Sequence, residues 1–216
     1  MLISLKHNFV FFSNPKCATT SIEKLFAKHF EIRIDSTKYG KHLRPSEFEK
    51  WTDLLAKNHN VPLLDKICTA RHPVDKLISW YTYRSRPILK KKRPNRYLGD
   101  TDFREFCKAG MKESGSLFFY NYKRNRYLVD IVVPLEHISR LTIYFNKKFK
   151  TQENLPTSNK SKKDFRSTEY RSIANAELPN ASKAFQKSVE QYNYLTQYYT
   201  GSKTKRLINI RSIFKN

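Results

Sequence analysis

The chain has 216 residues, of which 39% are hydrophobic and 14% aromatic. This length and composition exclude a disordered chain and predict one folded domain over residues 1–216. Lysine and arginine number 42 against 19 aspartates and glutamates, which gives a formal net charge of +23. The excess favours polyanionic partners: nucleic acid, an anionic membrane surface, an acidic polysaccharide or a charged nucleotide.

The cysteines and the lengths of the apolar runs indicate in which compartment the protein is expected. The three cysteines are widely spaced and fit neither a disulfide framework nor a zinc site, so we expect a reducing compartment and no metal. The opening apolar run is interrupted at residues 6–8, and no later run reaches ~20 apolar residues. We therefore expect a soluble, cytoplasmic protein without a membrane span.

Strand and helix patterns alternate through the first half of the chain. Residues 8–13 form a continuous apolar run, which is typical of a strand buried on both faces. Helical spacing of apolar residues follows at once, and a second such pair begins at residue 66. The predicted elements are strands at 8–13, 31–34 and 66–70, and helices at 20–30, 45–58 and 73–83.

The second half continues the alternation less regularly. Residues 84–96 are too basic and too interrupted by proline to belong to the core. After them we predict a helix at 101–112, a strand at 131–136, a helix at 137–149, a polar loop at 151–167 and a helix at 181–199. Repeated strand–helix alternation predicts an α/β fold, a three-layer sandwich with a mostly parallel central sheet flanked by helices.

The loop after the first predicted strand has the composition of an anion site. One lysine and three hydroxyl side chains precede or open a helix, whose N-terminus offers unpaired N–H groups and a partial positive charge. No glycine lies between Met1 and Gly40, which argues against the usual nucleoside triphosphatase loop. Taken alone, the loop also fits a capped helix beside a surface lysine. Its residues are Pro15, Lys16, Cys17, Ala18, Thr19, Thr20 and Ser21.

A second strand-to-helix junction favours the anion site. Arg71 follows the strand predicted at 66–70, Pro73 opens a helix, and Ser79 lies eight residues after Arg71. Ligands of open α/β sheets bind outside the carboxyl ends of the strands. We therefore expect Arg71 and the Lys16 loop to hold two anionic groups of one ligand.

Together the two junctions resemble the motifs of the sulfotransferases that use 3′-phosphoadenosine 5′-phosphosulfate (PAPS). Their first loop has the form PK-x-x-T-T/S, and their second motif has an Arg, a Pro two residues on and a Ser eight residues on. The resemblance implies a P-loop-like fold in which the loop from Pro15 to Ser21 holds the 5′-phosphosulfate. It implies that Arg71 and Ser79 hold the 3′-phosphate, and that the product is adenosine 3′,5′-bisphosphate (PAP).

Departures from the family pattern indicate one branch of it. Cys17 and Ala18 replace a small Ser/Gly pair of the small-molecule enzymes, and the late Arg-Lys-Gly signature of those enzymes is missing. The chain is more similar to the carbohydrate-type branch, which includes the heparan sulfate 2-O-sulfotransferase-like enzymes. The implied acceptor is a hydroxyl of a carbohydrate, which an anionic glycan would supply. By the same resemblance, Asn159, Lys160 and Ser161 belong to a late loop that closes over the nucleotide.

Sulfuryl transfer to a hydroxyl needs a base for the acceptor proton, and His42 is our choice. It follows a glycine turn, and the carbohydrate-type branch has a catalytic histidine in a similar segment. Glu47 and Glu136 are the alternatives, because a carboxylate serves in some relatives.

Two other functions stay open at this stage. One is a non-catalytic module that binds acidic glycan or nucleic acid, although no nucleic-acid module is recognisable. The other is a kinase-like phosphotransferase, which the missing glycines disfavour. The basic segment at residues 84–96 fits either a solvated loop or a rim that attracts an anionic acceptor.

Overall fold

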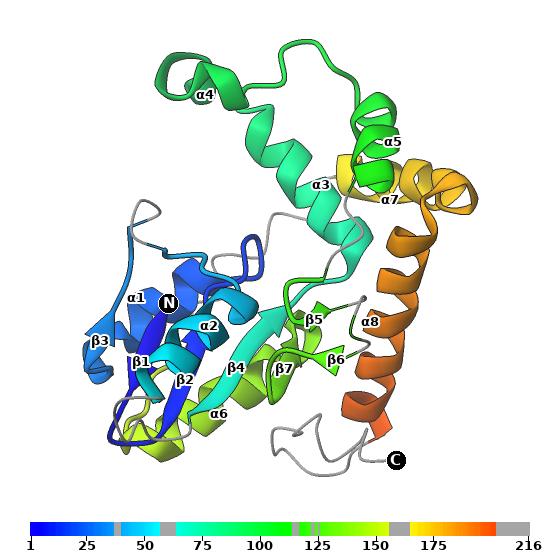
Figure 1. Cartoon of the computed structure of the whole chain (residues 1–216). Coiled ribbons are helices and arrows are strands. Elements are labelled where there is room, and N and C mark those ends of the chain that lie inside the picture. Colours follow the sequence, from blue (N-terminus) through cyan, green and yellow to red (C-terminus); the bar gives the residue numbers. More distant parts are fainter. Residues whose placement is uncertain are drawn as a thin grey trace. The chain divides into compact units, whose positions relative to one another are not determined.

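A computed structural model describes residues 1–36, 40–56, 64–113, 117–121, 124, 126–155 and 165–201. The chain divides into two compact units, and each is described by itself (Figure 1). The first unit comprises Met1–Ala70, Leu117–Asn159 and Leu195–Asn216, and the second comprises Arg71–Ser116 and Lys160–Tyr194. The expectation of one domain over residues 1–216 stays a prediction.

The first unit is built on a five-stranded sheet with the order β3-β1-β2-β4-β7. Strand β2 pairs in parallel with β4, and β4 with β7, whereas β1 is antiparallel to both β2 and β3. All strands of this sheet except β1 therefore run in one direction, which confirms the predicted α/β class with a mixed, mostly parallel sheet. The strands are β1 (Leu2–Ser4), β2 (Phe9–Phe12), β3 (Ile32–Arg33), β4 (Asp65–Ala70) and β7 (Ile131–Pro134).

Strand register places the carboxyl ends of the parallel strands at one edge of the sheet. Phe12 of β2 lies opposite Cys68 of β4, and Ala70 of β4 lies opposite Pro134 of β7. The loop after β2 therefore leaves the sheet at the edge where β4 also ends.

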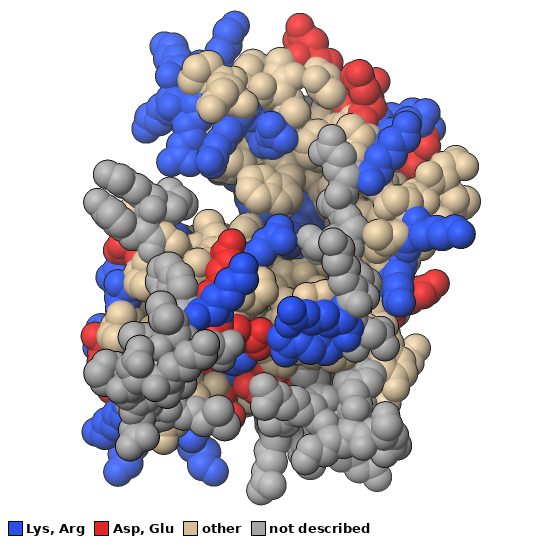
Figure 2. All heavy atoms as spheres, in the orientation of Figure 1, with Lys and Arg blue, Asp and Glu red and all other residues tan. Residues whose placement is uncertain are grey.

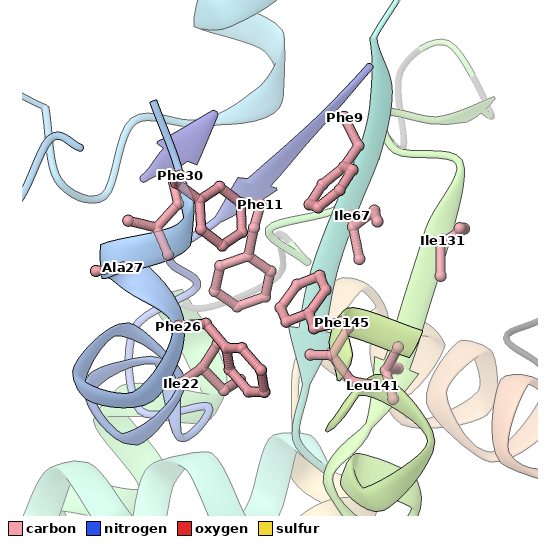
Figure 3. Packing of buried hydrophobic residues seen from close by; sticks show 12 residues of the cluster. Phe9, Phe11, Ile22, Phe26, Ala27, Phe30, Ile67, Ile131, Leu141 and Phe145 are labelled. Atoms are coloured by element: carbon pink, nitrogen blue, oxygen red, sulfur yellow. The ribbon is translucent and has the colours of Figure 1, made fainter. Parts of the chain in front are cut away.

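Helices α1 (Thr19–Phe26) and α6 (Ile138–Phe149) cover one face of the sheet (Figure 3). Phe145 of α6 lies at the centre of this core, with its ring centroid 5.5 Å from that of Phe9 and 5.2 Å from that of Phe26. A short 3-10 helix, η1 (Ala27–His29), continues α1 and adds Ala27 to the same core. Aromatic burial of this kind is a large part of what stabilises the unit.

Helix α2 (Pro45–Ala56) packs on the opposite face. There the ring of Phe12 meets Phe48 edge to face at 5.3 Å and Phe118 at 6.5 Å. Because both faces of the sheet are covered, every residue of β2 is buried. This is the reason that the strand reads as a continuous apolar run.

Three short strands of this unit were not predicted. β1 has only three residues and reverses into β2 through a tight turn in which Asn8 adopts a φ of 54°. β5 (Tyr120–Asn121) and β6 (Arg126–Tyr127) form a separate antiparallel pair. Segments this short do not show the periodicity from which a strand is read.

The second unit is helical, and its core lies between α3 (Pro73–Arg84), α5 (Phe103–Glu113) and α7 (Phe165–Glu177). Gly110 lets α5 approach α3 closely, because a Cβ at this position would lie 2.7 Å from Cδ2 of Leu77. The other helices of this unit are α4 (Pro87–Lys92), η3 (Pro94–Arg96) and η6 (Leu178–Asn180). Helix α8 (Lys183–Gly201) is divided between the two units, and η4 (Leu135–His137) belongs to the first.

Two sequence expectations need correction. Residues 84–96 were expected to stay out of the core, yet they include α4, whose Leu89 is buried. The polar loop expected at 151–167 ends early, because α7 begins at Phe165; residues 156–164 lie outside the described ranges. Helix α7 has weak amphipathic contrast, and contacts with α3 and α5 override its local sequence signal.

Candidate functional site

The loop between β2 and α1 adopts an unusual backbone conformation. Lys16 has a φ of 64° and Ala18 a φ of 57°, both in the left-handed region that favours glycine. For other residues this conformation costs about 1–2 kcal/mol each. The loop therefore adopts, without glycine, a backbone conformation that glycine adopts more readily.

Hydrogen bonds between this loop and the end of β4 hold the loop in place. The Asn14 side chain donates to the carbonyl of Thr69 at 2.9 Å, and the Thr69 hydroxyl donates to the carbonyl of Cys17 at 2.6 Å. Asn14, Cys17 and Thr69 are all buried, so these bonds are shielded from water. Such surroundings can maintain a strained backbone, and strain of this kind often accompanies a functional site.

The first turn of α1 offers backbone N–H groups to a ligand. Among the described residues, no acceptor bonds to the N–H of Ala18, Thr19 or Thr20, whereas the N–H groups of Ser21 and Ile22 both donate to the Ala18 carbonyl. The first turn contains no acidic residue that would repel an anion. With the helix dipole, these amides form a favourable environment for a phosphate or sulfate oxygen.

His42 lies beside the root of this loop. Its Nδ1 is 2.6 Å from the carbonyl oxygen of Ser13, the residue that follows β2. Because a carbonyl can only accept, Nδ1 carries the hydrogen and donates it, and Nε2 keeps its lone pair in the neutral ring. Within the described part of the chain, Nε2 has no hydrogen-bond partner, so the histidine has the tautomer that a general base requires.

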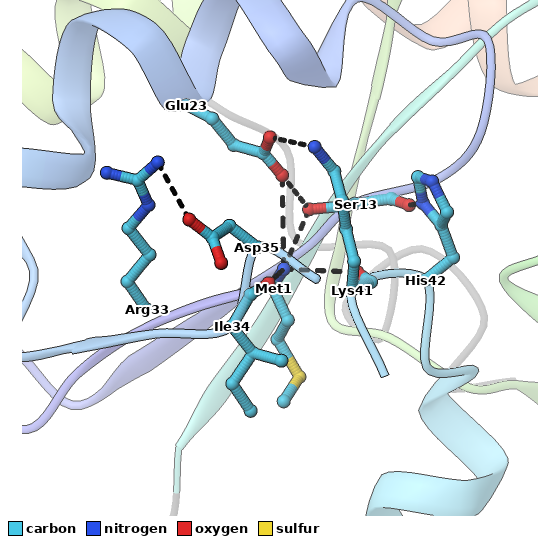
Figure 4. A network of polar contacts seen from close by, with 8 residues as sticks. All are labelled: Met1, Ser13, Glu23, Arg33, Ile34, Asp35, Lys41 and His42. Atoms are coloured by element: carbon cyan, nitrogen blue, oxygen red, sulfur yellow. Dashed lines mark hydrogen bonds and ion pairs between the residues drawn. The ribbon is translucent and has the colours of Figure 1, made fainter. Parts of the chain in front are cut away.

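A buried polar network fixes the residues on both sides of this contact (Figure 4). The carboxylate of Glu23 on α1 is 8% exposed; it accepts a 2.5 Å hydrogen bond from the Ser13 hydroxyl and forms a 2.6 Å ion pair with Lys41. The Met1 amino nitrogen donates to the Ser13 hydroxyl at 2.9 Å. Glu23 thereby connects α1, the end of β2 and the residue before His42.

Glu23, Ser13 and Lys41 were missed by sequence reasoning. The sequence did contain a sign that Glu23 is buried. It lies three residues before Phe26 and seven before Phe30, on the apolar face of its helix. A carboxylate at such a position needs a buried partner, and the pattern alone did not identify Lys41 as that partner.

The second predicted anion-binding junction, which contains Arg71 and Ser79, lies in the second unit. Arg71 directly follows β4 in the chain, and α3 begins two residues later at Pro73, in the predicted strand-to-helix arrangement. Arg71 and Ser79 are both partly exposed, and among the described residues neither side chain has a hydrogen-bond or ion-pair partner. Asp75 in the first turn of α3 is paired with Arg171 at 2.6 Å, which offsets its negative charge.

The other predicted site residues contribute less. Asn159, Lys160 and Ser161 lie outside the described residues. Glu47 is exposed and accepts a 3.0 Å hydrogen bond from the N–H of Arg44, which makes it a cap of α2. Glu136 is exposed in η4. These observations do not decide which residue is the base, and His42 stays the predicted one.

Comparisons with known proteins give no relatives: no family model, no curated protein and no solved structure matches the chain significantly. Among the described residues, no group of three or more His, Cys, Asp or Glu side chains is arranged to hold a metal ion. Within the same ranges, no helix combines the length and apolar character needed to cross a bilayer.

Proposed function

We propose that this protein is a PAPS-dependent sulfotransferase with a P-loop-like fold, which moves a sulfuryl group to a hydroxyl of a carbohydrate. The support is the conformation of the loop from Pro15 to Ser21, the N–H groups of Ala18, Thr19 and Thr20, and the orientation of His42. Arg71 and Ser79 are proposed to bind the 3′-phosphate, as the motif resemblance implies.

On the donor side, the loop supplies charge and directed hydrogen bonds. The N–H groups of Ala18, Thr19 and Thr20 would donate to the oxygens of the 5′-phosphosulfate, with the hydroxyls of the first turn beside them. Lys16 would neutralise the charge that develops on the bridging oxygen as the sulfur–oxygen bond breaks. PAP is the product on this side, and the sulfuryl group passes directly to the acceptor.

On the acceptor side, His42 would remove the hydroxyl proton. Nε2 takes the proton, the acceptor oxygen bonds to sulfur, and PAP leaves on the opposite side with the electron pair of the broken bond. The imidazolium that forms still donates through Nδ1 to the Ser13 carbonyl, which stabilises the positive charge. The single observation that carries this proposal is that His42 is oriented by the residue at the root of the Lys16 loop.

The competing function is a polyanion-binding module without catalysis, which the net charge of +23 favours. The two functions differ in what they require of one lysine. A nucleotide site depends on Lys16 individually, whereas general attraction to polyanions depends on the summed charge of the surface.

The test compares Lys16→Ala with Lys24→Ala, which changes an exposed lysine on α1, the helix that follows the loop. We expect Lys16→Ala to weaken PAP binding by roughly 10–100-fold, the usual effect of losing a hydrogen bond from a charged group. Lys24→Ala should leave PAP binding unchanged, and both variants should be retained on heparin alike. Calorimetry and heparin chromatography measure the two properties.

Equal effects of the two substitutions on PAP binding would contradict the proposal. In that case charge alone would account for nucleotide affinity, and the polyanion-binding module would be the better description.

A further inference from the structure

The basic segment at residues 84–96 forms an ordered cationic surface in the second unit. Six of its seven lysines and arginines are exposed, and Lys and Arg atoms gather over α4 in Figure 2. Among the described residues, none of the seven forms an ion pair; Glu177 and Asp75 of the second unit pair instead with Arg104, Lys108 and Arg171. The seven cations are Arg84, Arg86, Lys90, Lys91, Lys92, Arg93 and Arg96.

This segment is held in a defined shape despite its charge. Leu89 is 5% exposed and anchors α4, and the N–H of Arg93 donates to its carbonyl at 2.8 Å. Nε of Arg84 donates to the carbonyl of Arg96 at 3.1 Å, and the N–H of Leu98 donates to the carbonyl of Arg84 at 3.2 Å. The fold therefore keeps like charges together, which costs electrostatic energy that a bound anionic partner would offset.

An exposed isoleucine lies among these cations. The side chain of Ile88 is 52% exposed, more than that of the other large hydrophobic residues described as exposed. Lys91 and Lys92 are three and four residues further along α4, so all three side chains lie on one side of the helix. The surface thus combines a protruding aliphatic group with flanking positive charges.

We propose that this surface, α4 with its flanking arginines, docks on an anionic lipid membrane. Lipid headgroups supply dispersed negative charge for the cations, and the acyl boundary below them accepts an aliphatic side chain. Nucleic acid and acidic glycan would satisfy the cations but give Ile88 no partner. Residues 84–96 also contain no aromatic side chain on which a base could stack. The proposal does not depend on the sulfotransferase activity.

Vesicle sedimentation with the full chain tests the charge. Phosphatidylcholine vesicles with and without phosphatidylserine are the probes, and the variant combines Lys90→Gln, Lys91→Gln and Lys92→Gln. We expect binding only with phosphatidylserine, and a loss of roughly 100-fold in the variant. The matched control, Lys147→Gln with Lys148→Gln and Lys150→Gln, removes three exposed lysines from the end of α6 and should retain most of the binding. Equal losses would overturn the proposal.

A second pair of variants separates a membrane from other polyanions. Ile88→Ser should weaken vesicle binding by roughly 3–10-fold at unchanged charge, whereas Leu5→Ser, at a site 47% exposed in the first unit, should have no effect. Circular dichroism verifies that each variant is folded. Unchanged vesicle binding by Ile88→Ser, or a tighter affinity for a short DNA duplex or heparin than for phosphatidylserine vesicles, would assign the surface to a soluble polyanion and overturn the proposal.

Discussion

His42 owes its proposed role to one hydrogen bond. Nδ1 donates to the carbonyl of Ser13, and this leaves Nε2 as the nitrogen that can accept a proton. The Ser13 position is in turn set by Glu23, whose carboxylate also holds Lys41. This hydrogen bond fixes the orientation of the imidazole before an acceptor binds.

Replacing His42 should separate catalysis from nucleotide binding. We expect His42→Ala to lower the turnover of labelled PAPS by roughly 10²–10⁴-fold, the usual contribution of a general base. The affinity for PAP should stay the same, because the imidazole is not assigned to the phosphate groups. His29→Ala is the control, since His29 lies in η1 and contacts Glu153 and Phe149. Retained turnover in His42→Ala would move the base to a carboxylate such as Glu136.

The segment formed by β2, the loop and α1 contains a strained backbone that hydrogen bonds to the end of β4 hold in place. Ala18 is the N-cap of α1 and has a left-handed conformation with no side-chain capping bond. Glycine would adopt this conformation without the steric cost that a Cβ imposes. Ala27, at the other end of the same helix, has ordinary helical angles.

The same substitution should therefore have opposite effects at the two ends of α1. We expect Ala18→Gly to raise the free energy of unfolding by about 0.5–1 kcal/mol, the relief of strain less the entropy cost of glycine. Ala27→Gly should lower it by about 1 kcal/mol. Urea denaturation measures both. A loss of stability in Ala18→Gly comparable to that in Ala27→Gly would show that the loop does not hold residue 18 in the left-handed region.

Sequence patterns predicted the elements in which buried residues form a continuous run or recur with the period of a helix. The apolar run of β2, the spacing in α1 and the proline that opens α3 all correspond to observed boundaries within a few residues. β1, α4 and α7 were missed because each is short or weakly patterned and is stabilised by contacts distant in sequence. The candidate site shows the same division. Lys16 and His42 were predicted from local context, whereas the contacts of Glu23, Ser13 and Lys41 join residues that are distant in the sequence.

The whole molecule carries so much positive charge that many anions will bind to it. Affinity for a polyanion is therefore weak evidence for any particular function, and it falls steeply as salt is added. A specific nucleotide site must discriminate between ligands of similar charge. PAP and ATP provide this comparison, because PAP carries phosphates on both the 5′ and 3′ sides of the ribose and ATP carries all of its phosphates on one side.

Calorimetry of the intact protein with PAP and with ATP at physiological ionic strength is the most direct test of the sulfotransferase proposal. The proposal predicts that PAP binds and that ATP binds at least ~10-fold more weakly, a difference of about 1.4 kcal/mol. Absence of PAP binding even at low salt, or equal affinities for the two nucleotides, would contradict it.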